Sequence, residues 1–385
     1  MIIGIDARFA LKQRRGIGNY TLNLVQYLAK IDRENQYILY IDQPDLENLL
    51  PNSPNFLIKF LVPSNYLLWE QLRLPIQLIQ DKVDIIHCTA NTAPLFISEK
   101  VHLITTIHDV MFLKDTTLIP QSDILYQRLG RVYRSLVIKK TINNSSQIIT
   151  VSKYSKSDIW QHFPDVRQEL IQTTYESADS AFKILEDKHT SENIKHKLGI
   201  SGDYLLTLGG TDLRKNTSLV IKAFAKLKKS KTIDENLVIV GIANWQKTEF
   251  YKLVCSLKLE KEVIFTDFIS QDELVCLYNC ATLFLYPSLY EGFGIPPLES
   301  MACGTPVISS NTTSIPEIVG DAALQIDPNS QEELEAAVYK LLVDHSLRDN
   351  LIQRGLARAK QFSWQRMAEE TLDIYKSIIA DDNNL

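Results

Sequence analysis

Short apolar stretches rich in β-branched residues alternate along the chain with longer segments in which apolar residues recur every three to four positions. The short stretches predict strands and the longer segments predict helices. Their alternation is typical of βαβ units that build a parallel sheet. Two series of strands follow one another, the first at residues 2–6, 37–41, 56–62, 84–87, 103–108 and 147–151, the second at 204–208, 237–241, 263–266, 282–286, 307–309 and 324–326.

Two series of this kind predict two Rossmann-like, doubly wound α/β domains whose strand C-termini face a cleft. Strand patterns stop and polar residues dominate between Ser177 and Ser201. We therefore expect an N-terminal domain over residues 1–176 and a C-terminal domain over 177–363. The helical stretch at about 364–385 has no strand after it, and it can pack back onto the first domain.

The composition fits a globular protein of two domains. A length of 385 residues is too great for one ordinary core, and 45% hydrophobic with 23% charged residues is usual for a folded chain. A net charge of −5 argues against nucleic acid as the main partner. One predicted helix is an exception because basic residues recur along 128–140. A solvated helix face is the plainer interpretation, and contact with an anionic acceptor or a membrane surface is the alternative.

The location is expected to be cytoplasmic. The first residues lack a basic segment followed by a long apolar core, and no apolar run approaches the roughly 20 residues that span a bilayer. The five cysteines are odd in number and scattered, as expected for reduced thiols. A peripheral contact with the inner face of the membrane stays open through the basic helix.

The strongest chemical pattern lies between Tyr286 and Gly304, where a predicted strand, a Gly-Phe-Gly loop and a helix follow one another. Such a helix N-terminus favours an anion through its free N–H groups and its dipole. Two carboxylates flank the loop, Glu291 on the loop itself and Glu299 in the expected first turn of the helix. Carboxylates accept hydrogen bonds from vicinal hydroxyls of a hexose or a ribose, although Glu299 alone is equally explained by dipole stabilisation.

Three other segments follow predicted strands. Arg214 and Lys215 can neutralise a diphosphate, although isolated basic residues are more often solvated. Gly16 and Gly18 form a Gly-x-Gly after the first strand, but the third glycine of a dinucleotide fingerprint is absent. His108 ends another strand, where a lone histidine is more often structural.

The segment from Glu291 to Gly304 closely resembles the motif of the retaining glycosyltransferases of family four, which have the GT-B fold. The matching positions include both glutamates together with Gly292, Phe293, Gly294, Pro296, Leu298, Met301, Ala302 and Gly304. The resemblance implies that Glu291 contacts hydroxyls of the donor sugar and that Glu299 contacts the nucleotide ribose. It also implies that backbone amides from Phe293 to Leu298, Ile295 included, hold the sugar and the diphosphate.

The other segments are similar to the family as well, so the resemblance covers nearly the whole chain, and it is closest in the second domain. It implies that Arg214 and Lys215 stabilise the leaving diphosphate, although many members carry an arginine where this chain has Gly210. By resemblance, Gly16 and Gly18 approach the donor phosphate, and His108 lies near the reacting centre. Asp109 either orients His108 or contacts the acceptor. Phe268 packs against the nucleobase.

The activity implied is transfer of a hexose, with retention, from a nucleoside-diphosphate sugar to a saccharide or lipid-linked saccharide in polysaccharide or glycoconjugate biosynthesis. UDP-glucose is the first expectation for the donor and GDP-mannose the second. No metal or other cofactor is expected, because the chain contains no Asp-x-Asp sequence. The alternatives are a catalytically silent nucleotide-sugar-binding subunit and a Rossmann-type epimerase or oxidoreductase, which needs an intact Gly-x-Gly-x-x-Gly.

Overall fold

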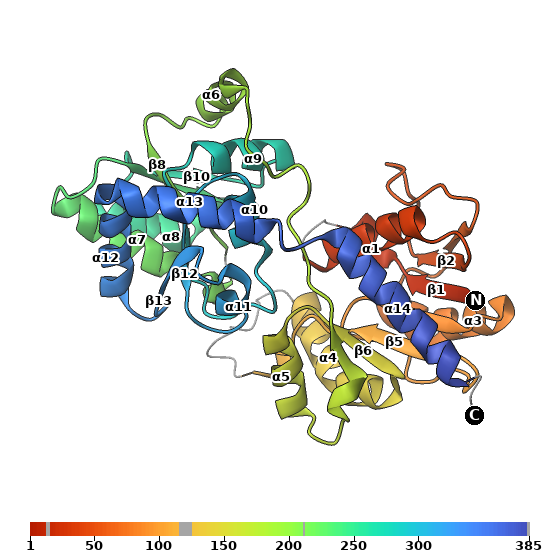
Figure 1. Ribbon diagram of the computed structural model, residues 1–385. Coiled ribbons are helices and arrows are strands. Elements are labelled where there is room, and N and C mark those ends of the chain that lie inside the picture. The colour runs from red at the N-terminus through yellow and green to blue at the C-terminus, as the bar shows by residue number, and fades with distance from the viewer. Residues whose placement is uncertain (13–15, 115–124, 211, 383–385) are drawn as a thin grey trace. The chain divides into compact units, whose positions relative to one another are not determined.

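The chain divides into two compact units, each with its own parallel sheet (Figure 1). The structure, a computed structural model, describes residues 1–12, 16–114, 125–210 and 212–382. Unit 1 comprises Met1–Lys114, Gln121–Glu176 and Ser363–Leu385, and unit 2 comprises Asp115–Pro120 and Ser177–Phe362. Among the described residues, no helix has both the length and the apolar character needed to cross a bilayer.

Unit 1 has a seven-stranded parallel sheet in the order β3-β2-β1-β4-β5-β6-β7. Its strands are β1 (Ile2–Asp6), β2 (Gln36–Ile41), β3 (Phe56–Phe60), β4 (Ile85–Cys88), β5 (His102–Thr106), β6 (Gln147–Thr150) and β7 (Ile171–Thr173). Its helices are η1 (Arg8–Leu11), α1 (Ile17–Ile31), α2 (Tyr66–Leu68), η2 (Trp69–Arg73), α3 (Leu74–Asp81), η3 (Met111–Leu113), α4 (Leu125–Asn144), α5 (Lys153–His162), η4 (Gln168–Leu170) and α14 (Trp364–Asp382).

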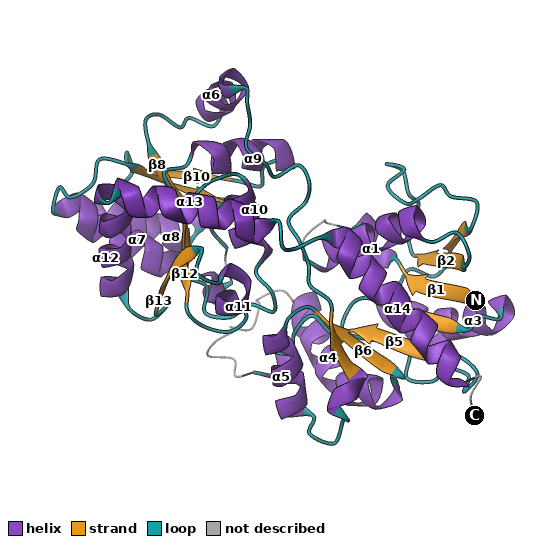
Figure 2. Ribbon diagram, viewed as in Figure 1, coloured by secondary structure: helices purple, strands orange, loops and turns teal. Residues whose placement is uncertain are grey.

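Helices cover both faces of this sheet, as Figure 2 shows. The alternation of side chains along β4 identifies the two layers. Cys88 packs with Trp69 of η2 in one core cluster, whereas the neighbouring His87 accepts or donates a 2.6 Å hydrogen bond with the Tyr375 hydroxyl of α14 on the other face. Helix α14 packs beside α1 (Figure 1), so the C-terminal segment belongs to unit 1.

The segment Tyr66–Asp81 is helical throughout despite an internal proline. Pro75 has no N–H to give to the preceding turn, and its ring would crowd the carbonyl of Gln71. The helix widens at this point into the π-helical segment η2, in which the N–H of Leu74 bonds to the Trp69 carbonyl. A π segment of this kind lets the helical direction continue past the proline.

Unit 2 has a six-stranded parallel sheet in the order β10-β9-β8-β11-β12-β13. Its strands are β8 (Tyr204–Leu208), β9 (Asn236–Val240), β10 (Val263–Thr266), β11 (Leu283–Tyr286), β12 (Val307–Ser310) and β13 (Ala323–Ile326). Its helices are α6 (Lys188–Lys197), η5 (Leu213–Lys215), α7 (Thr217–Lys229), η6 (Trp245–Lys247), α8 (Glu249–Leu257), α9 (Gln271–Cys280), α10 (Ile295–Ala302), α11 (Ile315–Val319), α12 (Gln331–Val343) and α13 (His345–Ala359).

Of the strands in the two sheets, the sequence predicted twelve to within two residues at each end and missed β7 of unit 1. This strand has only three residues, pairs with β6 at the edge of the sheet, and contains Gln172 and Thr173. Three residues are too few to display a period of two, so the apolar pattern carried no signal for it.

The strand order places a topological switch point in each sheet, between β1 and β4 in unit 1 and between β8 and β11 in unit 2. Open parallel sheets bind ligands outside the carboxyl ends of the strands at such a point. In unit 2 the segments that follow β8 and β11 contain Arg214, Lys215 and Glu291. The sheet topology therefore brings together residues that lie more than seventy positions apart.

Candidate active site

The loop after β8 holds its two basic residues in a fixed geometry. Asp212 caps the short helix η5 by accepting from the Arg214 N–H at 3.1 Å, and its other oxygen accepts from Arg214 Nε at 2.6 Å. Asn216 follows Lys215 in a left-handed conformation with φ of 57°, which asparagine tolerates. Its side-chain amide donates to the Pro287 carbonyl at 3.1 Å, which fastens this loop to the one after β11.

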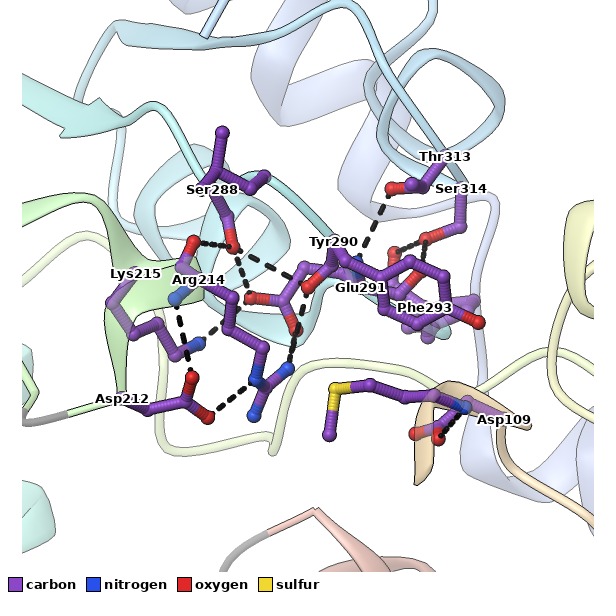
Figure 3. Close-up of polar contacts among 12 residues, drawn as sticks. Asp109, Asp212, Arg214, Lys215, Ser288, Tyr290, Glu291, Phe293, Thr313 and Ser314 are labelled. Atoms are coloured by element: carbon purple, nitrogen blue, oxygen red, sulfur yellow. Dashed lines mark hydrogen bonds and ion pairs between the residues drawn. The ribbon is translucent and has the colours of Figure 1, made fainter. Parts of the chain in front are cut away.

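Glu291 is the residue on which the two loops converge (Figure 3). Its Oε1 accepts from Lys215 Nζ at 2.8 Å, from the Tyr286 hydroxyl at 2.7 Å and from the Ser288 hydroxyl at 2.7 Å. Its Oε2 accepts from Arg214 Nη1 at 3.1 Å. Four donors, from the end of β11 and from the loops after β8 and β11, thus surround one carboxylate, and Glu291 is only 8% exposed.

This environment fixes the charge of Glu291. Burial alone would raise the pKa of the carboxyl group, but Lys215 and Arg214 outweigh it and hold the pKa at about 2. Glu291 is therefore an ionised hydrogen-bond acceptor at neutral pH. The charges of the two basic side chains are balanced by this carboxylate and by Asp212.

A sharp turn precedes helix α10 at Gly294, which has φ of +108°. A Cβ added at this position would lie 2.5 Å from Cδ1 of Ile315, so both the backbone conformation and the close approach require glycine. The helix starts at Ile295 and its N-terminus has no side-chain cap. Pro296 and Pro297 lack an N–H and the Leu298 N–H is in position to bond within the helix, so the donors that this N-terminus can offer a ligand are the backbone N–H groups of Gly294 and Ile295.

A turn after β12 supports the loop from Glu291 to Phe293, and sequence reasoning did not single it out. The Ser314 hydroxyl lies 2.9 Å from the Glu291 carbonyl and 2.7 Å from the Phe293 carbonyl (Figure 3). The Thr313 hydroxyl accepts from the Glu291 N–H at 3.2 Å. Gly292 and Phe293 are both buried in this loop. The backbone of the motif is thus held by hydroxyls from a different strand connection.

Glu299 lies in the second turn of α10, and the prediction that it lies in the first turn is wrong because the helix begins at Ile295. The effect of a helix dipole falls off within the first turn, so dipole stabilisation explains this residue less well. Its Oε2 accepts from the Tyr278 hydroxyl at 3.3 Å. Burial, helped by the charge of Asp179 and opposed by the Tyr278 hydrogen bond, raises the pKa of Glu299 to about 7.

Phe268 and Gly210 lie at the same carboxyl edge of the unit 2 sheet. Phe268 follows β10, and its side chain is 54% exposed beside Gly241. A Cβ added at Gly210 would meet nothing closer than Cγ of Lys215 at 3.4 Å. The position at which many family members carry an arginine therefore has room for a Cβ atom here.

In unit 1, His108 is buried and both of its ring nitrogens face acceptors. Nε2 lies 3.0 Å from the Thr89 carbonyl, and Nδ1 lies 3.3 Å from a carboxylate oxygen of Glu176. Its backbone N–H donates to the Asn91 side chain at 2.7 Å, and Tyr20 packs edge-on against the ring. Glu176, which lies at the end of the first predicted domain, was not foreseen as a partner because nothing in the local sequence connects it with β5.

The remaining predicted residues of unit 1 have mainly local backbone roles. Asp109 accepts from the Met111 N–H at 3.0 Å, and Glu176 rather than Asp109 contacts His108. Gly16 precedes α1 with φ of +31°, and Gly18 is buried in the first turn of that helix. Residues 13–15 lie outside the described part of the chain. Among the described residues, no three His, Cys, Asp or Glu side chains are grouped so that they could hold a metal ion.

The chain is similar to known glycosyltransferases over most of its length. Residues 190–358 match the family model described as "Glycosyl transferases group 1", and residues 14–179 match "Glycosyltransferase Family 4". The O-antigen chain mannosyltransferase B of Escherichia coli is 30% identical over 377 residues, which are 94% of this chain and 96% of the relative. The O-antigen chain mannosyltransferase RfbU of Salmonella typhimurium is 30% identical over 278 residues, 72% of this chain and 69% of that protein.

Solved structures share the fold at low sequence identity. Sucrose-phosphate synthase from Thermosynechococcus elongatus superimposes with a TM-score of 0.74 at 18% identity, covering 99% of this chain and 100% of that one. HepE of Anabaena, solved with UDP and glucose, gives a TM-score of 0.72 at 17% identity over 98% of this chain and 99% of that one. The chain belongs to the group 1 glycosyltransferases, and its two units are the Rossmann-like domains of the GT-B fold.

Proposed function

We propose that this glycosyltransferase moves a hexose, with retention at the anomeric carbon, from a nucleoside-diphosphate sugar to a saccharide or lipid-linked saccharide acceptor. The observation that carries the proposal is the meeting of Glu291 with Arg214 and Lys215 at the switch point of the unit 2 sheet. A site of this kind offers cations to a diphosphate and an ionised carboxylate to sugar hydroxyls. Curated relatives named for mannosyl transfer to O-antigen support a role in polysaccharide biosynthesis.

The proposed chemistry needs no protein nucleophile. The bond between the anomeric carbon and the phosphate oxygen breaks, the acceptor oxygen bonds to that carbon on the same face, and the acceptor proton passes to the departing phosphate. Negative charge grows on the diphosphate as the bond breaks. The Arg214 guanidinium, the Lys215 ammonium and the N–H groups at the start of α10 stabilise that charge.

Glu291 binds the sugar in this proposal and does not attack it. Its pKa of about 2 makes it an anionic acceptor for the sugar hydroxyls throughout the neutral range. Glu299 accepts from the ribose hydroxyls, and Phe268 packs against the nucleobase. We also propose that the transfer is independent of metal ions. Full activity in excess EDTA is expected, and a loss of activity that only Mg²⁺ or Mn²⁺ restores would overturn this part.

For the donor, we propose GDP-mannose first and UDP-glucose second, which reverses the order expected from the sequence alone. The reason is that relatives at 30% identity are named mannosyltransferases, whereas HepE, solved with UDP and glucose, is 17% identical and shares the fold only. A thermal-shift panel of GDP, UDP, ADP and their sugars discriminates between the donors, because a ligand selective for the native state raises its melting temperature.

Donor turnover tests the function itself. The wild-type protein should release nucleoside diphosphate from the donor that stabilises it, and Lys215→Ala should abolish the release while Lys222→Ala, an exposed lysine of α7, leaves it unchanged. Binding of the donor without turnover by the wild-type protein would favour a silent nucleotide-sugar-binding subunit. Equal turnover by the two lysine variants would refute the role of Lys215.

A further inference from the structure

The helical segment Tyr66–Asp81 of unit 1 is apolar on two opposite sides. Its inner side, which includes Trp69, Leu74 and Leu78, is buried in a core cluster. Its outer side has one large apolar residue per turn, at Leu68, Leu72, Ile76 and Ile79, and each is between 46% and 63% exposed. A helix that packs on one side of a soluble protein usually has polar residues on the other. The outer side therefore requires an explanation other than the core.

Helix α4 carries a second exposed apolar row. Leu129, Val132 and Leu136 recur at helical spacing, and they are between 55% and 76% exposed, as is Phe96 on the loop after β4. Large apolar side chains exposed singly are ordinary on soluble proteins. A contiguous group of them marks an interaction site.

Gln71 joins the elements that carry the two rows. Its amide nitrogen donates to the Tyr133 hydroxyl of α4 at 2.6 Å and to the Ala93 carbonyl at 3.1 Å. Its amide oxygen accepts from the Leu95 N–H at 2.8 Å. The immediate neighbours of these residues in sequence are Leu72, Val132 and Phe96. We refer to the outward side chains of Leu68, Leu72, Ile76, Ile79, Phe96, Leu129, Val132 and Leu136 together as the apolar surface.

The exposed charges of the two helical segments are basic among the described residues, whereas the loop that carries Phe96 has exposed Glu99 and Lys100 of opposite sign. Helix α4 contains no Asp or Glu, and its Lys139 and Lys140 are exposed. The Nζ of Lys140 lies 3.6 Å from the centroid of the Phe96 ring. On the segment Tyr66–Asp81 the two acidic residues are withdrawn, because Glu70 is buried beside Arg8 and Asp81 is buried beside Lys59. The exposed lysines of α4 belong to a chain whose net charge is −5.

Part of the basic helix serves the interior of unit 1. Arg131 donates to the carbonyls of Phe112 at 3.1 Å and Lys114 at 2.7 Å, and Arg134 lies over the Phe112 ring. Helix α4 therefore does not present a uniformly basic face over residues 128–140. The exposed feature is apolar, with Lys139 and Lys140 at its C-terminal end.

We infer that the apolar surface docks on an anionic lipid bilayer, with its apolar side chains in the headgroup and acyl boundary and its lysines against anionic headgroups. This combination of exposed apolar rows with exposed lysines is typical of interfacial membrane binding. A second copy of the chain fits less well, because a twofold contact pairs this surface with itself, and the described residues of its two helical segments offer no exposed acid to the lysines. The inference adds a membrane to the partners of the proposed function. It rests on that function only for its biological reason, since a lipid-linked acceptor would be found at a membrane.

Vesicle co-sedimentation at low salt tests the inference with the full chain. The wild-type protein should bind vesicles of equal phosphatidylglycerol and phosphatidylcholine, bind pure phosphatidylcholine weakly, and dissociate as salt is added. Leu72→Gln with Ile76→Gln should reduce the partition coefficient about tenfold or more, since both side chains leave the acyl boundary. The matched control is Tyr339→Gln with Val343→Gln, two exposed apolar residues of α12 in unit 2.

The charge contribution is tested by Lys139→Gln with Lys140→Gln, matched by Lys222→Gln with Lys229→Gln on α7. The first pair should weaken binding to the anionic vesicles severalfold, and the second pair should not. Equal binding by the matched pairs, or no binding by the wild-type protein at low salt, would overturn the inference. So would a dimer without lipid that Leu72→Gln with Ile76→Gln converts to a monomer.

Donor turnover is measured on the same preparations without vesicles. If the wild-type protein turns over the donor but does not bind vesicles, the docking surface alone is refuted. Vesicle binding by a protein that turns over no donor refutes the proposed function alone.

Discussion

Replacing Glu291 with glutamine should destabilise unit 2 and do so in a pH-dependent way. The folded environment lowers the pKa of this carboxyl group from its usual 4.5 to about 2. A shift of that size corresponds to roughly 3 kcal/mol of folding free energy, and little solvent screening applies to so buried a group. Glutamine keeps the shape and still accepts from Tyr286 and Ser288, but it leaves Lys215 and Arg214 with less opposing charge. At neutral pH we expect a loss of about 3 kcal/mol.

The sign of the pH dependence follows from the lowered pKa. The carboxylate contributes its full stabilisation above the unfolded pKa of 4.5, and the contribution disappears as the pH falls from there to about 2. The difference between the wild-type protein and Glu291→Gln should therefore shrink over that range. In thermal scans at neutral pH the loss corresponds to roughly 6–12 °C for a unit of this size.

The assay is thermal or urea unfolding at a series of pH values, with the exposed Glu260→Gln as the control that removes a charge without a buried network. The reasoning is refuted if Glu291→Gln is as stable as Glu260→Gln at neutral pH, or if its deficit is the same at acid pH.

The same variant separates the two functions assigned to the loop. Glu291→Gln releases Lys215 from its carboxylate partner and leaves Arg214 paired with Asp212 alone, so a nucleoside diphosphate should raise its melting temperature at least as much as that of the wild-type protein. Sugar transfer should nevertheless be lost, because an amide is a poorer acceptor for the sugar hydroxyls than a carboxylate. A variant that loses its response to the diphosphate would show that Glu291 organises the phosphate site instead.

Three further predictions follow from the geometry. Burial raises the pKa of Glu299 to about 7, so the affinity for the nucleotide, measured by titration calorimetry, should weaken as the pH falls through that value. The Glu299→Gln variant should bind the nucleotide weakly at every pH. An affinity of the wild-type protein that does not change with pH would contradict the ribose contact. Gly294→Ala should lower stability by about 1–3 kcal/mol, because φ is +108° and Ile315 is in the way, whereas Gly210→Ala should leave the melting temperature nearly unchanged; similar effects would refute the argument. Tyr375→Phe should cost about 1–3 kcal/mol by leaving the buried histidine of β4 without one partner, and an unchanged unfolding midpoint would count against it.

The fold was largely predictable because most of its strands are buried and form continuous apolar runs between helical patterns. The bounds of β1, β8 and β10 agree with the prediction at both ends. Local capping was also readable, since Ser152 accepts from the Ser155 N–H as its position before α5 suggests. Edge strand β7 was missed because pairing with β6, and not its own pattern, makes it a strand.

The site was predictable only as far as its chemistry is local in sequence. Glu291, Arg214 and Lys215 lie in recognisable segments, and the strand order then brings those segments together. Thr313 and Ser314, which hold the backbone around Glu291, lie on a different connection and look like ordinary loop residues. A hydroxyl becomes informative only when its partner in space is known, so no local pattern could have identified them.

The apolar surface illustrates a stricter limit. From residue 67 to residue 79 apolar side chains occupy nearly every side of the helix, and a pattern of that kind by itself predicts a fully buried helix. The periodicity of a sequence shows how many sides of a helix are apolar, but it does not show how many of those sides the rest of the protein covers. Here the structure covers one side with Trp69, Leu74 and Leu78 in the core and leaves the other exposed. Large apolar side chains kept in water along four helical turns oppose solubility without aiding the fold, so their presence is best explained by a partner that removes them from water.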